Sequence, residues 1–220
     1  MTRKARSSAS QKHRHESKAT RSPVPFVVAG VALVVVAAAV IAVVLASGQP
    51  SLSEPSTATT VVTGTPLPEY TAGTADPAVG MALPSLSNIG LDGATMTIAA
   101  DGRAKAIVIL AHWCPHCQAE VPRIVDWLAA NTVPEGVDLV ALTTNISATQ
   151  TNYPPSAWLE REGWTVPTMI DDANSTGYVA LGAMNFPGWV FVGADGKVQL
   201  RTTGEISMDS FSQMLNQIAP

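Results

Sequence analysis

The only two cysteines of this 220-residue chain, Cys114 and Cys117, are separated by Pro115 and His116 in the stretch AHWCPHCQAEVP. Cysteines at this spacing can bind a metal, form a structural cross-link or exchange disulfides with other thiols. A structural zinc site needs four ligands, and His112 and His116 lie too close to the cysteines in sequence for all four to bind one tetrahedral ion. Loose copper binding by these residues stays an alternative. A cross-link between residues three apart closes too small a loop to add much stability.

Thiol–disulfide exchange is the chemistry that this arrangement favours. Apolar residues at helical spacing follow the cysteines, among them Val121, Ile124 and Leu128, and they predict a helix that begins near Cys114. At the start of a helix, free backbone N–H groups and the helix dipole stabilise a thiolate. We therefore expect Cys114 to attack the substrate, and Cys117, about one turn later, to resolve the mixed disulfide. No metal and no cofactor other than this disulfide is expected.

The rest of the C-terminal region alternates between strand and helix patterns, which predicts an α/β domain with a central mixed sheet flanked by helices. The turn at Asp101-Gly102 suggests that strands over 95–100 and 106–110 pair with each other. The Asp195-Gly196 turn predicts a hairpin, and Ser207 is the expected N-cap of the last helix. The other expected elements are a strand over 137–142, a short helix over 154–163, a strand over 166–170 and a helix over 175–182.

The N-terminal region carries the pattern of a membrane anchor. Val24–Ala46 contains no charged residue, and a helix of this length is roughly 34 Å long, enough to cross a hydrocarbon core of about 30 Å. A cleaved signal peptide is the alternative, but its apolar core is usually only about 7–15 residues long. The first 22 residues carry seven basic side chains and one acidic side chain. We therefore predict a cytoplasmic tail at 1–23, one transmembrane helix at 24–46, and an extracytoplasmic remainder.

Composition divides the remainder of the chain into two parts. Residues 47–80 are rich in Ser, Thr, Pro and Gly, which predicts a flexible tether. The folded domain is expected over 81–220. The chain after residue 46 carries six basic and sixteen acidic side chains, a balance that argues against a nucleic-acid partner.

Together, these features resemble a known family. The motif from Trp113 to Cys117, followed by Glu120 and Pro122, is similar to the active site of the membrane-anchored bacterial oxidoreductases of the TlpA/ResA (DsbE-like) type, with Ile124 in place of a leucine. The resemblance covers about 81–220. It implies a thioredoxin-like fold and substrates that are thiols or disulfides of exported proteins. It also implies a redox partner in the membrane.

The resemblance also implies a cis-proline that faces the disulfide just before a strand. Pro167 and Pro187 are the candidates, and the pattern around NFPGWVFVGADGK favours Pro187. The backbone of Phe186 would then pair with an extended substrate peptide, and Trp113 would add apolar contact area beside the disulfide. An ordinary trans proline opening a strand is the alternative for Pro187, and core packing is the alternative for Trp113.

Two departures from related proteins affect the mechanism. Thioredoxins bury an aspartate at the position that corresponds to Val108, so water or another carboxylate must accept the proton of Cys117. Glu120 is the carboxylate nearest in sequence. It could equally be a solvent-facing residue of the helix with no part in the chemistry. The Pro115-His116 dipeptide is that of the oxidising DsbA-type proteins, in which an imidazole near the first cysteine favours its thiolate and makes the disulfide a better oxidant. The role of His112 stays open.

The sequence therefore predicts an extracytoplasmic, membrane-tethered thiol–disulfide oxidoreductase that oxidises exported proteins. The alternatives are a reductant for cytochrome c or copper-site thiols, and a copper-binding module.

Overall fold

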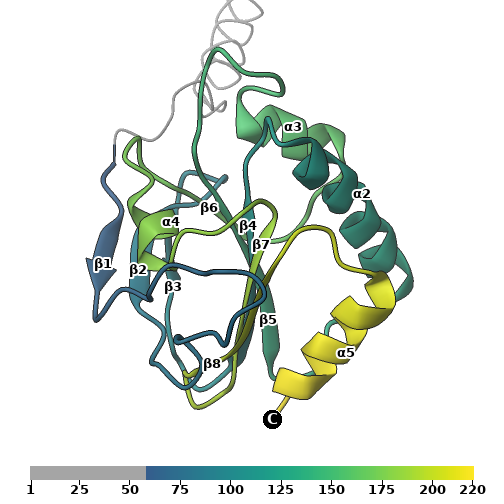
Figure 1. The fold of residues 1–220 in the computed structure, drawn as a ribbon. Helices are drawn as coiled ribbons and strands as arrows, with labels where there is room; N and C mark the ends of the chain where they lie inside the picture. Colours follow the sequence, from purple (N-terminus) through teal and green to yellow (C-terminus); the bar gives the residue numbers. More distant parts are fainter. Residues whose placement is uncertain (1–57) are drawn as a thin grey trace, which may run out of the picture. The chain divides into compact units, whose positions relative to one another are not determined.

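The structure is a computed structural model, and it describes residues 58–220 (Figure 1). The predicted tail at 1–23, the predicted membrane span at 24–46 and the first part of the predicted tether lie outside the described residues. Between residues 58 and 220, no helix combines the length and the apolar character that a membrane crossing requires.

A five-stranded mixed sheet forms the centre of the described domain, with the strand order β6–β5–β4–β7–β8. β4, β5 and β6 are parallel, whereas β7 is antiparallel to both of its neighbours. The predicted β7–β8 hairpin turns at Gly196, whose φ of +75° suits glycine. The strands are β4 (Ala104–Leu110), β5 (Val137–Thr143), β6 (Thr168–Ile170), β7 (Gly188–Val192) and β8 (Val198–Thr203).

A separate three-stranded antiparallel sheet consists of β1 (Val61–Thr63), β2 (Ser85–Ile89) and β3 (Thr95–Ile98). The prediction that the segments at 95–100 and 106–110 pair with each other is wrong, because β3 pairs with β2 and lies in this smaller sheet. Both edges of β4 are already occupied, by β5 and by β7. The turn at Asp101-Gly102 therefore carries the chain from one sheet to the other instead of closing a hairpin.

Helices cover the central sheet. Those described between residues 58 and 220 are α2 (Pro115–Ala130), α3 (Pro155–Arg161), α4 (Thr176–Ala180) and α5 (Met208–Ile218). As predicted, α2 begins directly after Cys114, and Ser207 is the N-cap of α5, accepting a hydrogen bond from the Ser210 N–H (3.1 Å). Figure 1 shows α2 and α5 on one face of the sheet, with α4 and the smaller sheet on the other.

The core is divided by the central sheet into two apolar clusters. Successive side chains of β4 point to opposite faces, so Val108 and Leu110 join the cluster under α2, α3 and α5. Ile107 and Ile109 join the cluster under the smaller sheet and α4. A strand that is buried on both faces needs a nearly continuous apolar run, and residues 106–110 of β4 supply one.

Residues 60–80 belong to the folded domain, although the sequence analysis assigned them to a flexible tether that ends at 80. Leu67 and Ala78 are buried in the cluster under the smaller sheet. The fully buried guanidinium of Arg201 donates to both carboxylate oxygens of Asp76, with Nε–Oδ2 at 2.9 Å and Nη2–Oδ1 at 2.5 Å. Contacts with residues more than a hundred positions away therefore order a segment whose composition resembles a linker.

Candidate active site

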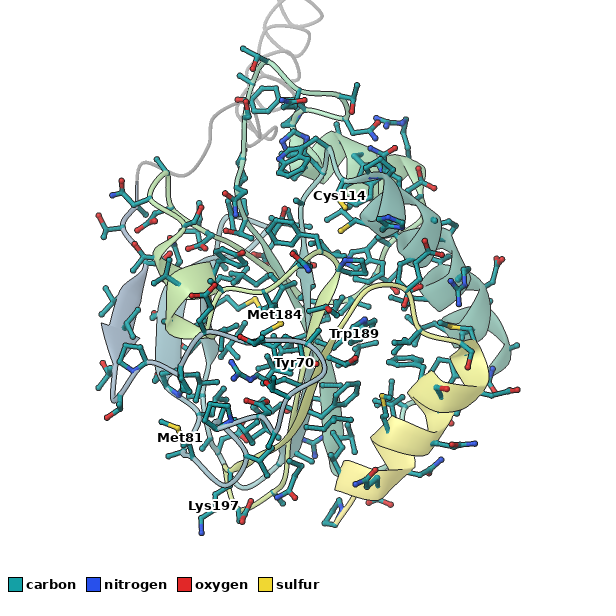
Figure 2. The ribbon with its side chains drawn as sticks, viewed as in Figure 1. Tyr70, Met81, Cys114, Met184, Trp189 and Lys197 are labelled. Atoms are coloured by element: carbon teal, nitrogen blue, oxygen red, sulfur yellow. The ribbon has the colours of Figure 1, made fainter. Side chains whose placement is uncertain are left out.

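Four loops meet at the end of the central sheet where the parallel strands β4 and β5 finish. They are residues 111–114 after β4, 144–154 after β5, 181–187 before β7 and 204–207 after β8. In open α/β sheets this end is the usual place of an active site. Figure 2 shows Cys114 at this end and Lys197, in the β7–β8 turn, at the opposite end of the domain.

Cys114 occupies the N-cap position of α2 with an extended backbone (φ −75°, ψ 121°). Its side chain makes no capping hydrogen bond, so the first turn of the helix keeps free N–H groups next to the sulfur. The thiol contacts the carbonyl of Phe186, with Sγ–O at 3.7 Å. Cys114 is 7% exposed, whereas Cys117 is not exposed at all. Cys114 is therefore the cysteine that a substrate meets first.

Cys117 lies one turn further along α2, beneath Cys114. Its sulfur accepts a hydrogen bond from the backbone N–H of Ala111 (3.5 Å). Burial raises the pKa of the Cys117 thiol strongly, and the neighbouring Cys114 and Glu120 raise it further, while the Ala111 N–H acts in the opposite direction. Cys117 therefore needs a proton acceptor before it can attack a mixed disulfide.

Glu120 is fully buried, so its interpretation as a solvent-facing helix residue is wrong. Its Oε1 accepts a hydrogen bond from the backbone N–H of Ile206 (3.1 Å). Its Oε2 lies 3.1 Å from Arg123 Nη1 without the angle of a hydrogen bond. Burial raises the pKa of Glu120, and the Ile206 N–H and Arg123 oppose that shift. A buried carboxyl with a raised pKa binds a proton more readily than an ordinary glutamate does. Val108 is buried and apolar, as predicted.

His116 is exposed, like Pro115 before it, and its partner is a carboxylate. Nδ1 lies 2.8 Å from Oε1 of Glu205, in the loop between β8 and α5. The described residues contain no hydrogen bond between His116 and Cys114. Arg123 binds the other carboxylate oxygen of Glu205 (Nη1–Oε2 3.0 Å). Glu205 was not predictable as a site residue, because nothing in the local sequence connects it with a motif 89 residues earlier.

Trp113, Phe186 and Pro187 lie together beside Cys114. The rings of Trp113 and Phe186 meet edge to face with their centroids 5.9 Å apart. Trp113 Nε1 donates to the carbonyl of Asn145 (2.8 Å), so this half-buried side chain also joins the motif to the loop after β5. The Phe186–Pro187 peptide bond is cis, and the Pro187 carbonyl accepts a hydrogen bond from Gly204 N (2.8 Å).

His112 is fully buried behind the motif, and both of its ring nitrogens are engaged. Nδ1 lies 2.6 Å from the carbonyl of Thr151 and must donate its proton, whereas Nε2 accepts a hydrogen bond from the Ser147 N–H (3.2 Å). His112 therefore holds the loop after β5 against the active site. In this conformation neither nitrogen is free to bind copper. Among the described residues, no group of three or more His, Cys, Asp or Glu side chains is placed to hold a metal ion.

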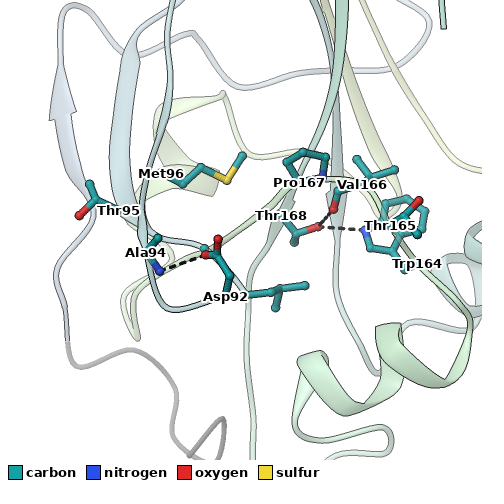
Figure 3. Close-up of a pocket in the computed structure, with 11 residues that line it drawn as sticks. Asp92, Ala94, Thr95, Met96, Trp164, Thr165, Val166, Pro167 and Thr168 are labelled. Carbon is teal, nitrogen blue, oxygen red and sulfur yellow. Dashed lines mark hydrogen bonds between the residues drawn. The ribbon is translucent and has the colours of Figure 1, made fainter. Parts of the chain in front are cut away.

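A hollow of about 430 Å³ lies away from the cysteines, between the β2–β3 turn and the segment that leads into β6 (Figure 3). Its lining includes Met96 and Pro167, the proline that the sequence analysis set aside as a cis candidate. Thr168 accepts a hydrogen bond from Trp164 Nε1 (2.9 Å) and donates one to the Val166 carbonyl (2.8 Å). Because these polar groups satisfy each other, the hollow carries no evident chemistry.

Comparison with known proteins places this geometry in a family. The redoxin family profile matches residues 78–218, and no curated protein sequence matches the chain. A secreted disulfide oxidoreductase from Mycobacterium tuberculosis, described as homologous to Escherichia coli DsbE, is 21% identical over 60% of this chain and 94% of its own (TM-score 0.50). A thiol:disulfide interchange protein from Chlorobium tepidum is 24% identical over 66% and 99% (TM-score 0.50). StoA from Bacillus subtilis is 16% identical over 63% and 98% (TM-score 0.51).

The structural neighbours establish a thioredoxin-like α/β fold, as the sequence resemblance implied. The chain belongs to the redoxin family. With paired cysteines at the start of α2, this member of the family is a thiol–disulfide oxidoreductase.

Proposed function

We propose that this protein is a membrane-tethered, extracytoplasmic oxidoreductase that introduces disulfides into exported proteins. The observation that carries the proposal is the unequal exposure of the two cysteines. Cys114, at the helix start, is 7% exposed, whereas Cys117 beneath it is not exposed at all. In its oxidised state the Cys114–Cys117 disulfide accepts two electrons. A substrate thiolate attacks Cys114 Sγ, and the Cys117 thiolate leaves and takes up a proton. The second substrate thiolate then displaces Cys114 from the mixed disulfide, so the substrate gains a disulfide and the enzyme becomes a dithiol.

The location is proposed from the sequence. The apolar run over 24–46 and the basic residues before it favour a single-pass anchor with the cysteines outside the cytoplasm. Disulfides form and persist in such a compartment. A membrane-impermeant thiol reagent should then label Cys114 in intact cells. A matched control lacks both native cysteines and carries Ser7→Cys in the tail, and it should be labelled only after lysis. Labelling that requires lysis in the native protein would place the domain in the cytoplasm.

The oxidising direction is proposed from the Pro115-His116 dipeptide, because a nearby imidazole favours the reduced enzyme and so raises the potential. The opposite direction, as a reductant of cytochrome c or copper-site thiols, has one observation in its favour. The carboxylate of Glu205 lies against His116 and opposes the effect of a positive imidazole on a thiolate. A copper-binding module has less support, because His112 has no free ring nitrogen.

A measurement of the reduction potential tests whether the protein oxidises or reduces its substrates. The full-length protein in detergent is equilibrated with glutathione buffers, and the reduced fraction is determined by alkylation. The oxidising proposal requires a potential clearly above that of thioredoxin. A value near or below about −250 mV, in the range of thioredoxin, would contradict it and would favour the reductant.

A further inference from the structure

The loop between β8 and α5 is bound to the catalytic helix by a row of polar side chains. His116, Glu120 and Arg123 are spaced four and three residues apart on α2 and therefore share one face of the helix. All three contact the Glu205-Ile206 dipeptide of the loop. The loop is therefore bound next to both cysteines of the motif, although it lies almost ninety residues away in the sequence.

Glu205 is the member of this row that contacts the motif itself. One carboxylate oxygen faces His116 Nδ1 at 2.8 Å, and the other faces Arg123 Nη1 at 3.0 Å. Exposed ion pairs are usually weak, in part because long side chains lose freedom when they pair. Here the loop backbone is already fixed, because the Ile206 N–H donates to Glu120 Oε1 and the Ile206 carbonyl accepts from Arg123. Less freedom is therefore lost when Glu205 binds His116.

The contact assigns the proton on His116. An ionised carboxylate only accepts hydrogen bonds, so Nδ1 of His116 carries a proton and donates a hydrogen bond to Glu205. The pKa of Glu205 is lowered, chiefly by this hydrogen bond and then by the charges of His116 and Arg123, and Glu205 is therefore ionised at neutral pH. The Cys114 thiol instead contacts the Phe186 carbonyl.

We propose that Glu205 is a positioning residue that holds the His116 imidazole away from Cys114 and so makes the disulfide a weaker oxidant than the Pro-His motif alone would. The inference deepens the proposed function and rests on it, because it concerns what sets the reduction potential of the Cys114–Cys117 pair. Glu205 takes part in no bond change. The disulfide still gains two electrons and two protons on reduction, and Glu205 shifts the equilibrium by withholding the Nδ1–H donor of His116 from the Cys114 thiolate.

The test compares redox equilibria of full-length variants with glutathione. Glu205→Ala should shift the equilibrium constant about tenfold toward the reduced dithiol, which corresponds to about 30 mV for two electrons. Glu205→Gln, which keeps the shape and an acceptor oxygen but removes the charge, should shift it in the same direction by less. Asp209→Ala is the matched control, since Asp209 is an exposed carboxylate in the first turn of α5 without a hydrogen bond to α2. It should leave the equilibrium unchanged.

The double variant His116→Ala/Glu205→Ala distinguishes an effect that Glu205 exerts through His116 from a direct effect of its charge on the sulfurs. If Glu205 acts through His116, the double variant should have the potential of His116→Ala alone. A tenfold shift that persists in the His116→Ala background would overturn the inference, because the charge would then act directly on the sulfurs. Unchanged potentials in both folded Glu205 variants would overturn it as well. A native protein that exchanges no disulfide with glutathione would instead refute the proposed function, and the inference with it.

Discussion

The carboxylate of Glu120 accepts a hydrogen bond from the backbone N–H of Ile206, with Oε1–N at 3.1 Å, inside the interface of α2 with the loop before α5. This contact places a buried carboxyl on the catalytic helix, whereas the strand position at which thioredoxins carry an aspartate is occupied here by Val108. Because the charge of Glu120 acts on the Cys117 thiol and raises its pKa, this carboxyl is the group from which a proton acceptor for Cys117 can be expected.

The substitution Glu120→Gln should slow the release of substrate from the mixed disulfide. The glutamine side chain can still accept the Ile206 hydrogen bond, but it cannot accept the proton of Cys117. The loss is expected to be about a hundredfold, at the lower end of general-base contributions. Stopped-flow thiol exchange with a peptide disulfide measures the step, and Glu160→Gln, at an exposed position of α3, is the control. Faster release would show that Glu120 acts only as a negative charge that raises the pKa of Cys117.

The two cysteines should differ when they are replaced singly by serine. In Cys117→Ser, the more exposed Cys114 can still attack a substrate disulfide, and no second thiol resolves the product, so mixed disulfides should accumulate. In Cys114→Ser, the fully buried Cys117 should form almost none. Non-reducing gels of the two variants after incubation with an oxidised substrate peptide measure the difference. Equal trapping by both variants would refute the assigned order of attack.

The parts of the fold that were predictable from the sequence have local signals. The β7–β8 hairpin follows from Asp195-Gly196, and α5 follows from the N-cap Ser207 and the spacing of Phe211 and Leu215. The pairing of β3 was not predictable in this way. The Asp101-Gly102 turn looks the same whether the chain folds back on itself or passes into a second sheet, and only the occupation of both β4 edges by distant strands decides between the two.

The site, like the fold, contains residues with local sequence signals and residues whose roles depend on distant segments of the chain. Cys114, Cys117 and the proline after Phe186 stand in recognisable motifs. The burial of Glu120 could not be predicted from helical spacing, because it depends on where the 204–207 loop lies. The contact between Glu120 and Arg123 could be predicted from their spacing of three residues on one helix. Glu205 has no such signal in the local sequence. The anchoring role of His112 depends on Ser147 and Thr151, in a loop whose position the sequence did not indicate.

Asp76→Ala should destabilise the domain by about 3–5 kcal/mol, the usual cost of leaving one partner of a buried ion pair without the other. Arg201 would keep its hydrogen bonds to the carbonyls of Pro68 (2.9 Å) and Leu181 (3.1 Å), but its buried charge would lose its counterion. Urea unfolding monitored by tryptophan fluorescence measures the change, and Asp126→Ala, at an exposed position of α2, is the control. A loss below about 1 kcal/mol, the range of exposed ion pairs, would show that residues 60–80 contribute little to the fold.

His112 should make the domain less stable as the pH falls below neutrality. Burial lowers the pKa of His112 from its usual 6.5, so the unfolded chain binds the proton more readily than the folded one. The free energy of unfolding should therefore be highest above pH 6.5 and fall progressively as the pH decreases toward the folded pKa. Protonation of Nε2 also removes the acceptor of the Ser147 N–H, so the loop after β5 should loosen first.

Urea unfolding at several values between about pH 7.5 and about pH 5, which brackets the usual histidine pKa, provides the measurement. Glu120 contributes with the opposite sign in this range, because its pKa is raised, and the series is therefore best carried out in the Glu120→Gln background. Adding His112→Asn should flatten the pH profile even where it lowers the stability overall. A slope of equal size with and without His112 would assign the pH dependence to other groups. The carboxyls of Asp76 and Asp172 are poor candidates, because their pKa values are lowered from 3.8 and they titrate below this range.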